Sequence, residues 1–300
     1  MGGMMPVRVG FVGVGTMGAP MARRLKGAGF ETLFFARRQA VIETLQAEGL
    51  HYVQNLRDLA AQTDVVLMCL PDDAVVDAVG SVVLSAMKAG GVVVDHSTVS
   101  PYTSRRLAAE AKRRGISHLD APISGGPMGA EAGTLAIMVG GEEEAFRRCH
   151  PLFEAMGRHI FYLGPSGAGN IAKLVNQLII GITQEALVEG FVLGSRMGLD
   201  PKLLYDVLAV STGESAMLHR SIPNCILQRD FTPKFTVDLL YKDLRLANDL
   251  GRGEGIRLLE GAVAEQVFRE AAAEGLGSED ISALVKPLER QAGVVVEKRS

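Results

Sequence analysis

The stretch VRVGFVGVGTMGAPMARRL, residues 7–25, decides the fold of this chain. It opens with a short run of apolar, mostly β-branched residues, which predicts a buried strand. From about Met17 it continues as a helix-forming run. Between the two, Gly13, Gly15 and Gly18 have the spacing Gly-x-Gly-x-x-Gly, which is typical of a strand-to-helix turn that binds a dinucleotide.

Each glycine of this turn has its own physical role. Gly13 permits the tight turn, a side chain at Gly15 would hold the backbone away from a pyrophosphate, and Gly18 lets the helix pack close to the strand. The N–H groups and the positive dipole end of the helix then face the phosphates. We expect the turn to contact the cofactor through Gly13, Gly15, Thr16, Met17 and Gly18. The alternative is a glycine-rich turn without a ligand.

Composition and charge indicate a globular protein and exclude several classes. A chain of 300 residues with 47% apolar residues is long enough for two domains. Its net charge of −3 offers no electrostatic reason to expect nucleic acid or an anionic membrane as a partner. No uninterrupted apolar run approaches the length of about 18 residues that would span a bilayer. Residues 1–6 lack the features of a secretory signal, so we expect a cytoplasmic protein.

The cysteines and histidines predict neither disulfides nor a metal site. The three cysteines lie far apart, at Cys69, Cys149 and Cys225, which suits reduced thiols. The six histidines do not have the spacing of metal ligands. We therefore expect no metal.

Two arginines follow the second predicted strand, residues 32–35. Arg37 and Arg38 stand about 20 residues past the glycines, where an acidic residue would bind the ribose 2′-hydroxyl of NAD. Guanidinium groups pair well with phosphate, so the sequence favours NADP, with NAD as the alternative. The arginines could instead only face solvent.

Predicted strands and helices alternate through the first half of the chain and predict a doubly wound parallel sheet. Further strands are expected at residues 65–70, 92–95, 116–119 and 135–139. The carboxyl ends of parallel strands share one edge. We therefore expect the glycine turn, Arg37, Leu70, Pro71 and Thr98 to meet at one crevice.

The pattern changes near residue 165, where a glycine-rich break precedes a long helical run at residues 170–197. This run is apolar around most of its circumference, which predicts a helix packed on several sides, including burial between subunits in a dimer or tetramer. Later helical runs are expected at residues 201–210, 236–250, 256–274 and 278–292. We expect a dinucleotide-binding domain at residues 1–165 and an all-helical substrate and oligomerisation domain at residues 166–300.

A Ser-Gly-Gly turn follows the predicted strand that ends near Asp120. Successive N–H groups at Ser124, Gly125 and Gly126, with the serine hydroxyl, could form a concave anion site suited to a substrate carboxylate. The alternative is an ordinary loop with glycines at positive φ.

The start of the long helix carries a lysine on an otherwise apolar segment. Gly169, Lys173, Asn176 and Gln177 share one helical face, and we expect Gly169 to leave open space one turn before the lysine. Desolvation would lower the pKa of Lys173 and suit it to proton transfer near neutral pH. Asn176 and Gln177 could hold its amine or the substrate. The alternative is a lysine whose stem covers apolar surface while the amine reaches water.

Together these motifs resemble the β-hydroxyacid dehydrogenase family, which includes 3-hydroxyisobutyrate dehydrogenases and tartronate semialdehyde reductases. The resemblance covers essentially the whole chain and rests on four stretches in order, residues 10–18, 120–126, 167–176 and 231–244. It implies Lys173 as the catalytic residue. It implies substrate contacts from Ser124, Gly125, Gly126 and Asn176, and cofactor contacts from Leu70, Pro71, Thr98 and Lys242. Without the resemblance, Lys242 and Asp243 would be interpreted as a solvated pair on a helix.

The details of the resemblance favour an NADP-dependent reductase of a small semialdehyde acid, of the tartronate or succinic semialdehyde kind. The pair Asn176-Gln177 is similar to the tartronate semialdehyde reductases, and Ala36-Arg37 to NADP-using members. The alternatives are an NAD-dependent 3-hydroxyisobutyrate dehydrogenase, an imine reductase and a non-catalytic dinucleotide-binding module. Related imine reductases and scaffold-like members lack the lysine, so Lys173 counts against both.

Overall fold

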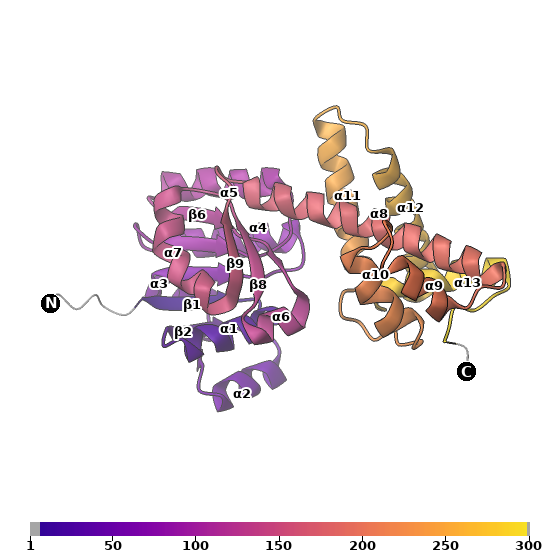
Figure 1. Cartoon of the computed structure of the whole chain (residues 1–300). Helices are drawn as coiled ribbons and strands as arrows, with labels where there is room; N and C mark the ends of the chain where they lie inside the picture. Colours follow the sequence, from indigo (N-terminus) through magenta and orange to yellow (C-terminus); the bar gives the residue numbers. More distant parts are fainter. Residues whose placement is uncertain (1–6, 299–300) are drawn as a thin grey trace. The chain divides into compact units, whose positions relative to one another are not determined.

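The computed structural model describes residues 7–298 and divides the chain into two compact units (Figure 1). Residues 1–6, on which the expectation about a secretory signal depends, lie outside the described residues. The first unit ends at Lys173 and the second begins at Leu174. The sequence placed a domain boundary between residues 165 and 166. The structural division falls later, inside helix α8 (Ala168–Arg196), because the first turn of α8 is hydrogen-bonded to the first unit.

A six-stranded parallel sheet with the order β3-β2-β1-β4-β5-β6 forms the centre of the first unit. Its strands are β1 (Arg8–Val12), β2 (Glu31–Phe35), β3 (His51–Tyr52), β4 (Val65–Met68), β5 (Val92–Asp95) and β6 (Ser117–Asp120). The order of strand addition reverses between β1 and β4, which is the position where ligands bind in open α/β sheets. The doubly wound α/β fold expected from the sequence is therefore confirmed.

Helices cover both faces of this sheet, which explains why its strands are continuous apolar runs. One face packs against α1 (Gly18–Gly27), α2 (Gln39–Ala47) and α7 (Glu143–Met156). The other face packs against α3 (Leu56–Gln62), α4 (Asp73–Ala86) and α5 (Pro101–Arg113). Along β1, Phe11 belongs to the first of these cores and Val12 to the second, as the two-residue period of a strand requires.

A separate three-stranded sheet takes the segment that was expected to continue the main sheet. It comprises β7 (Ile123–Ser124), β8 (Leu135–Val139) and β9 (Gly157–Tyr162), with α6 (Gly126–Ala132) between the first two. The expectation that residues 135–139 belong to the main sheet is therefore wrong. Residues 135–139 instead pair antiparallel with β7, which follows β6 after only Ala121 and Pro122.

The second unit consists of helices and loops within residues 174–298, which confirms the all-helical expectation. After α8 come α9 (Pro201–Leu208), α10 (Ala216–Ser221), α11 (Val237–Gly253), α12 (Leu259–Ala271) and α13 (Val285–Ala292). Short irregular helical turns lie at Ile222–Ile226, Ala272–Leu276 and Ile281–Leu284. The core of this unit is built around Phe191, Leu240 and Phe268. The sequence did not predict α10.

Helix α8 is not covered on all sides by its own chain. Phe191 is buried, but Val175, Ile179 and Leu193 are 50–65% exposed. The expected packing on several sides is therefore seen in part within one chain, and the expected burial between subunits remains a prediction. The other helices of the second unit cover only part of the circumference of α8. By length and composition alone α8 could cross a membrane, a criterion that core helices of soluble proteins also meet.

Candidate functional site

The glycine turn after β1 has the geometry that a dinucleotide requires. Gly13 has φ +89°, and a side chain there would collide with the carbonyl oxygen of Cys69. A Cβ on Gly18 would collide with the carbonyl oxygen of Gly13, so α1 can pack this closely only without one. A Cβ on Gly15 would meet no described atom within 4 Å. The turn therefore has room at Gly15, next to the N–H groups of α1.

Hydrogen bonds join the carboxyl ends of the neighbouring strands to this turn. The N–H of Cys69 donates to the Val12 carbonyl over 2.9 Å, and the N–H of His96 donates to the Met68 carbonyl over 2.7 Å. The Leu70 N–H donates to the Ser97 hydroxyl over 2.8 Å. Leu70, and with it the start of the Pro71 loop, is thus held next to the loop that carries Thr98.

Arg37 and Arg38 follow the end of β2, and both are exposed. Their strand is the neighbour of β1, with Phe35 in register with Val12. Two guanidinium groups therefore stand beyond the strand adjacent to the glycine turn. A dinucleotide that carries a 2′-phosphate fits these features: the space at Gly15, the N–H donors of α1 and the guanidinium groups of Arg37 and Arg38.

Lys173 is buried in the second turn of α8, with 8% of its surface exposed. The first turn is bonded to Asp120, whose carboxylate accepts the N–H of Gly167 over 2.7 Å and of Asn170 over 2.9 Å. Burial raises the pKa of Asp120, and these backbone donors oppose the rise. The sequence assigned no role to Asp120, because a carboxylate that caps a helix 47 residues away leaves no local pattern.

The expectation that Gly169 leaves open space before Lys173 is wrong. A Cβ at Gly169 would collide with the Met138 carbonyl oxygen and would lie 2.7 Å from that of Asp120. The glycine is needed because the start of α8 packs directly against the ends of β8 and β6.

The Ser-Gly-Gly turn lies where β7 ends and the short helix α6 begins. Gly125 has φ +135° and Gly126 has φ +64°, and Ser124 is half-buried. Positive φ at two successive glycines is compatible with an anion-binding turn and with an ordinary loop. The substrate contacts expected of these residues remain a prediction.

A buried polar chain connects α8 and α11 within the second unit. Asn176 Nδ2 donates to Gln177 Oε1 over 3.0 Å, and Gln177 Nε2 donates to Asp243 Oδ2 over 2.6 Å. Lys242 Nζ lies 3.0 Å from Asp243 Oδ1, with 17% and 4% of the two side chains exposed. The interpretation of Lys242 and Asp243 as a solvated pair is therefore wrong.

The burial and hydrogen bonding of the Asp243 carboxylate were missed in the sequence analysis, which named the residue. The helical period puts it on the same face of α11 as Leu240, Leu244 and Ala247, which are buried. A carboxylate on a buried helical face requires polar partners, and this signal was available in the sequence.

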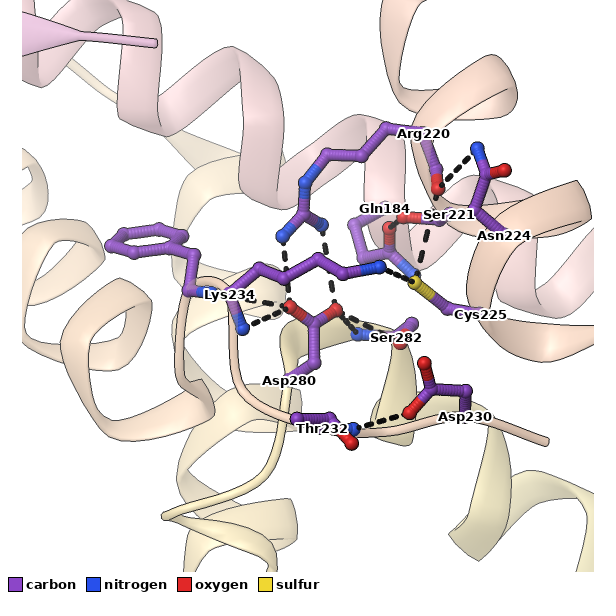
Figure 2. Close-up of polar contacts among 11 residues, drawn as sticks. Gln184, Arg220, Ser221, Asn224, Cys225, Asp230, Thr232, Lys234, Asp280 and Ser282 are labelled. Atoms are coloured by element: carbon purple, nitrogen blue, oxygen red, sulfur yellow. Dashed lines mark hydrogen bonds and ion pairs between the residues drawn. The ribbon is translucent and has the colours of Figure 1, made fainter. Parts of the chain in front are cut away.

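Another buried carboxylate, Asp280, organises the loop that leads into α11 (Figure 2). Arg220 Nη2 lies 2.8 Å from Asp280 Oδ2, and the same oxygen accepts the N–H groups of Lys234 and Phe235 over 3.2 Å. The Ser282 hydroxyl donates to the other oxygen over 2.9 Å. Asp280 therefore holds the shape of the stretch Phe231–Phe235, one of the four that carry the family resemblance.

Three more titratable groups are buried at or near the strand ends of the first unit. Burial raises the pKa of Asp95 to about 7, with smaller contributions from the charges of Asp120 and Asp73. Burial lowers the pKa of His96 and of His118 to about 4. Within residues 7–298, no group of three His, Cys, Asp or Glu side chains is arranged to hold a metal ion.

The predicted site residues are divided between the two units. Lys173, the Ser-Gly-Gly turn and all predicted cofactor contacts except Lys242 belong to the first unit. Asn176, Gln177 and Lys242 belong to the second. The roles of all these residues remain predictions.

Comparison with known proteins gives matches over nearly the whole chain. Residues 8–164 match the NAD binding domain of 6-phosphogluconate dehydrogenase, and residues 167–288 match the NAD-binding domain of NADP-dependent 3-hydroxyisobutyrate dehydrogenase. A 2-(hydroxymethyl)glutarate dehydrogenase of Eubacterium barkeri is 39% identical over 97% of this chain and 97% of its own. A 2-hydroxy-3-oxopropionate reductase of Escherichia coli is 35% identical over 95% of this chain and 98% of its own.

Solved structures agree with these sequence matches. The 3-hydroxyisobutyrate dehydrogenase of Mycobacterium tuberculosis, solved with L-serine, superposes with a TM-score of 0.89 at 35% identity and covers 95% of this chain and 99% of its own. An imine reductase of Pseudomonas sp. is 21% identical with a TM-score of 0.61, covering 94% of this chain and 99% of its own, a likeness that shows the fold alone. With its dinucleotide turn, its helical second unit and relatives that match it end to end, the chain belongs to the β-hydroxyacid dehydrogenase family of NAD(P)-dependent oxidoreductases.

Proposed function

We propose that this enzyme is an NADP-dependent reductase of a small semialdehyde acid, which it interconverts with the corresponding 3-hydroxy acid. The observation that carries the proposal is the position of Lys173. It is a buried lysine one turn beyond the point where α8 is bonded to the carboxyl end of β6, in the same unit as the glycine turn. The Escherichia coli relative is named as a reductase of this substrate class.

The proposed chemistry assigns a proton to Lys173. When bound, the nicotinamide supplies the hydride that reduces the carbonyl carbon. The Lys173 ammonium donates a proton to the developing alkoxide, and in the oxidative direction the neutral amine accepts that proton. Ser124, Gly125 and Gly126 hold the substrate carboxylate through a hydroxyl and backbone N–H groups.

Contacts within the second unit orient the polar side chains that follow Lys173 on α8. Asn176 and Gln177 bind the substrate, and the bond from Gln177 to Asp243 fixes the orientation of the Gln177 amide. Lys242, held by Asp243, contacts the cofactor.

Replacement of the lysine tests the proposal. Lys173→Ala should lower kcat by about 10²–10⁴, the usual contribution of a positioned acid–base group, and leave the Kd for NADPH unchanged. The measurement is steady-state reduction of 2-hydroxy-3-oxopropionate and succinic semialdehyde, with NADPH binding followed by fluorescence. Lys202→Ala, an exposed lysine on α9, serves as the matched control and should retain full activity. Near-normal turnover by Lys173→Ala would refute the assignment.

Cofactor preference is tested at the end of β2. Arg37→Asp should weaken NADPH binding far more than NADH binding, because only NADPH carries the 2′-phosphate that a guanidinium would pair with. Arg38→Asp should act in the same direction. Arg113→Asp, at an exposed position at the end of α5, is the control. Equal losses for both cofactors at Arg37 would contradict the preference for NADP.

A panel of 3-hydroxy acids, semialdehydes and cyclic imines, each with NADPH and NADH, separates the remaining alternatives. Preference for 3-hydroxyisobutyrate with NAD would favour the dehydrogenase alternative, and turnover of imines would favour an imine reductase. Absence of any turnover with retained NADPH binding would favour a non-catalytic module.

We further infer a cytoplasmic homo-oligomer, a dimer or tetramer, without a nucleic-acid or membrane partner. The exposed apolar side chains of Val175, Ile179 and Leu193 on α8 support association between subunits. Light scattering of the full chain measures the oligomeric state.

A further inference from the structure

The first turn of α8 is bonded to the sheet of the first unit by two side chains rather than by packing alone. The Asp120 carboxylate uses one oxygen for the N–H of Gly167 and the other for the N–H of Asn170. Asp120 is itself fixed, because its own N–H and C=O bond to Gly140 over 3.0 and 2.8 Å. The carboxylate thus connects the end of β6 to the N–H groups of one helical turn.

Asn170 provides a second connection from the same turn. Its side chain is fully buried, and its Oδ1 accepts the N–H of Val99 over 3.1 Å. Its Nδ2 donates to the Ser104 hydroxyl on α5 over 3.1 Å. The loop after β5, which carries Thr98, and the start of α5 are therefore bonded to the turn that Asp120 holds.

Packing leaves this turn no freedom to move toward the sheet. The collision that a Cβ at Gly169 would make with the Met138 carbonyl oxygen shows that backbone meets backbone there. The hydrogen bonds of Asp120 and Asn170 and the close backbone approach at Gly169 all act on one turn. They set both the rotation of the helix about its axis and its position along that axis.

Lys173 follows Asn170 by three residues, on the adjacent turn and the same side of the helix. A rise of about 1.5 Å per residue puts its Cα only about 4.5 Å further along the axis than that of Asn170. A rigid helix transmits any displacement of its first turn directly to this position. All of these residues lie in the first unit.

We propose that Asp120, together with Asn170, is a positioning residue for Lys173: it fixes the start of α8 so that the lysine amine is held where proton transfer occurs. This inference rests on the proposed function, because it takes Lys173 as the proton donor. Misplacement of a reacting group by about 1 Å can cost about 10² in rate. Loss of the Asp120 connection should therefore appear in kcat rather than in cofactor binding.

The test is a kinetic double-mutant cycle on the full enzyme, made of wild type, Asp120→Asn, Lys173→Ala and the double variant. The assay uses NADPH with 2-hydroxy-3-oxopropionate or succinic semialdehyde, whichever is turned over. Asp120→Asn should lower kcat about 10–100-fold and leave KM and the Kd for NADPH within about twofold. In the Lys173→Ala background the same change should lower kcat by less than about threefold, because the group that Asp120 positions is gone.

The matched control is Asp200→Asn in the second unit. Asp200 also caps a helix with its carboxylate, which accepts the N–H groups of Lys202 and Leu203 over 2.8 and 2.9 Å. Asp200→Asn makes the same change from carboxylate to amide at the start of α9, a helix that does not carry Lys173, so its kcat should stay within about twofold of wild type. A comparable loss of kcat in Asp200→Asn would overturn the inference.

The outcomes separate this inference from the proposed function. An equal loss from Asp120→Asn in both backgrounds would overturn the positioning role and leave Lys173 as the proton donor. Full activity of Lys173→Ala alone would instead refute the proposed function. If Asp120→Asn does not fold, Asn170→Ala takes its place in the cycle, with the same two outcomes.

Discussion

The glycine turn of the first unit is built from backbone, whereas the polar chain of the second unit is built from buried side chains. The glycine turn after β1 works through φ angles, close approach and N–H groups, with Gly13 as its most constrained residue. The polar chain of the second unit works through Gln177 and Asp243, and the adjoining loop through Arg220 and Asp280. The two regions therefore differ in which substitutions they tolerate.

This difference follows from how each region satisfies its polar groups. Backbone N–H groups at strand ends and helix starts are present whatever the side chains are, so the first region needs only the absence of side chains at critical points. Buried charges in the second region are stable only while paired, so each pair depends on both partners. The three predictions below test this contrast.

The largest effect is expected from a single methyl group in the glycine turn. Gly13→Ala introduces a Cβ at φ +89° that collides with the Cys69 carbonyl oxygen. We expect a loss of unfolding free energy on the order of 4 kcal/mol, measured by urea denaturation. Gly15→Ala should leave stability nearly unchanged and weaken NADPH binding, because its Cβ enters the room where the ligand is expected. Equal stability losses in the two variants would contradict this account of the turn.

The next largest effect is expected from the buried ion pair of the second unit. Asp280→Asn removes the charge that pairs with Arg220, which is 30% exposed on its side chain. We expect the unfolding free energy to fall by about 3 kcal/mol, since an unpaired guanidinium is left partly buried. Asp206→Asn, which breaks the exposed pair with Lys202 on α9, should change it by less than about 1 kcal/mol. Comparable losses in the two variants would show that burial of the Asp280 pair has no energetic consequence.

The smallest effect concerns the pH dependence of the first unit. The pKa of Asp95 is raised by burial to about 7, so its contribution to stability is present below its usual pKa and is lost as pH rises toward 7. Asp95→Asn does not titrate. Its stability relative to wild type should therefore increase by about 1 kcal/mol between pH 6 and pH 7. Thermal unfolding at the two pH values measures this difference, and a constant offset between the proteins would contradict it.

Two buried histidines make stability depend on pH in the opposite direction to Asp95. The measurement therefore compares wild type with Asp95→Asn. Burial lowers the pKa of His96 and His118 to about 4, so their contribution is present above the usual histidine pKa and is lost as pH falls through about 4. Wild-type stability alone would mix the two trends. Both proteins contain the two histidines, so the histidine contribution cancels in the difference between the stability of Asp95→Asn and that of wild type.

Local motifs predicted the main sheet and its glycine turn because their physics is local. The run of residues 7–25 contains the strand, the turn and the helix, and the roles expected of Gly13 and Gly18 match the structure. The role expected of Gly169 did not, because the atoms that crowd it belong to Met138 and Asp120. The second sheet was missed because the apolar run 135–139 has the same pattern in either sheet.

By itself the sequence determined the doubly wound fold of the first unit, the helical fold of the second and the position of the dinucleotide turn. It could do so because hydrophobic periodicity and glycine spacing are patterns within a few residues. Only the tertiary structure decided which buried charges meet. Asp120 reaches the start of α8, Asp243 reaches Gln177 and Asp280 reaches Arg220 across 47 to 66 residues of chain. A carboxylate can pair with any donor that folding brings near it, so its partner is set by packing and not by the residues around it in the sequence.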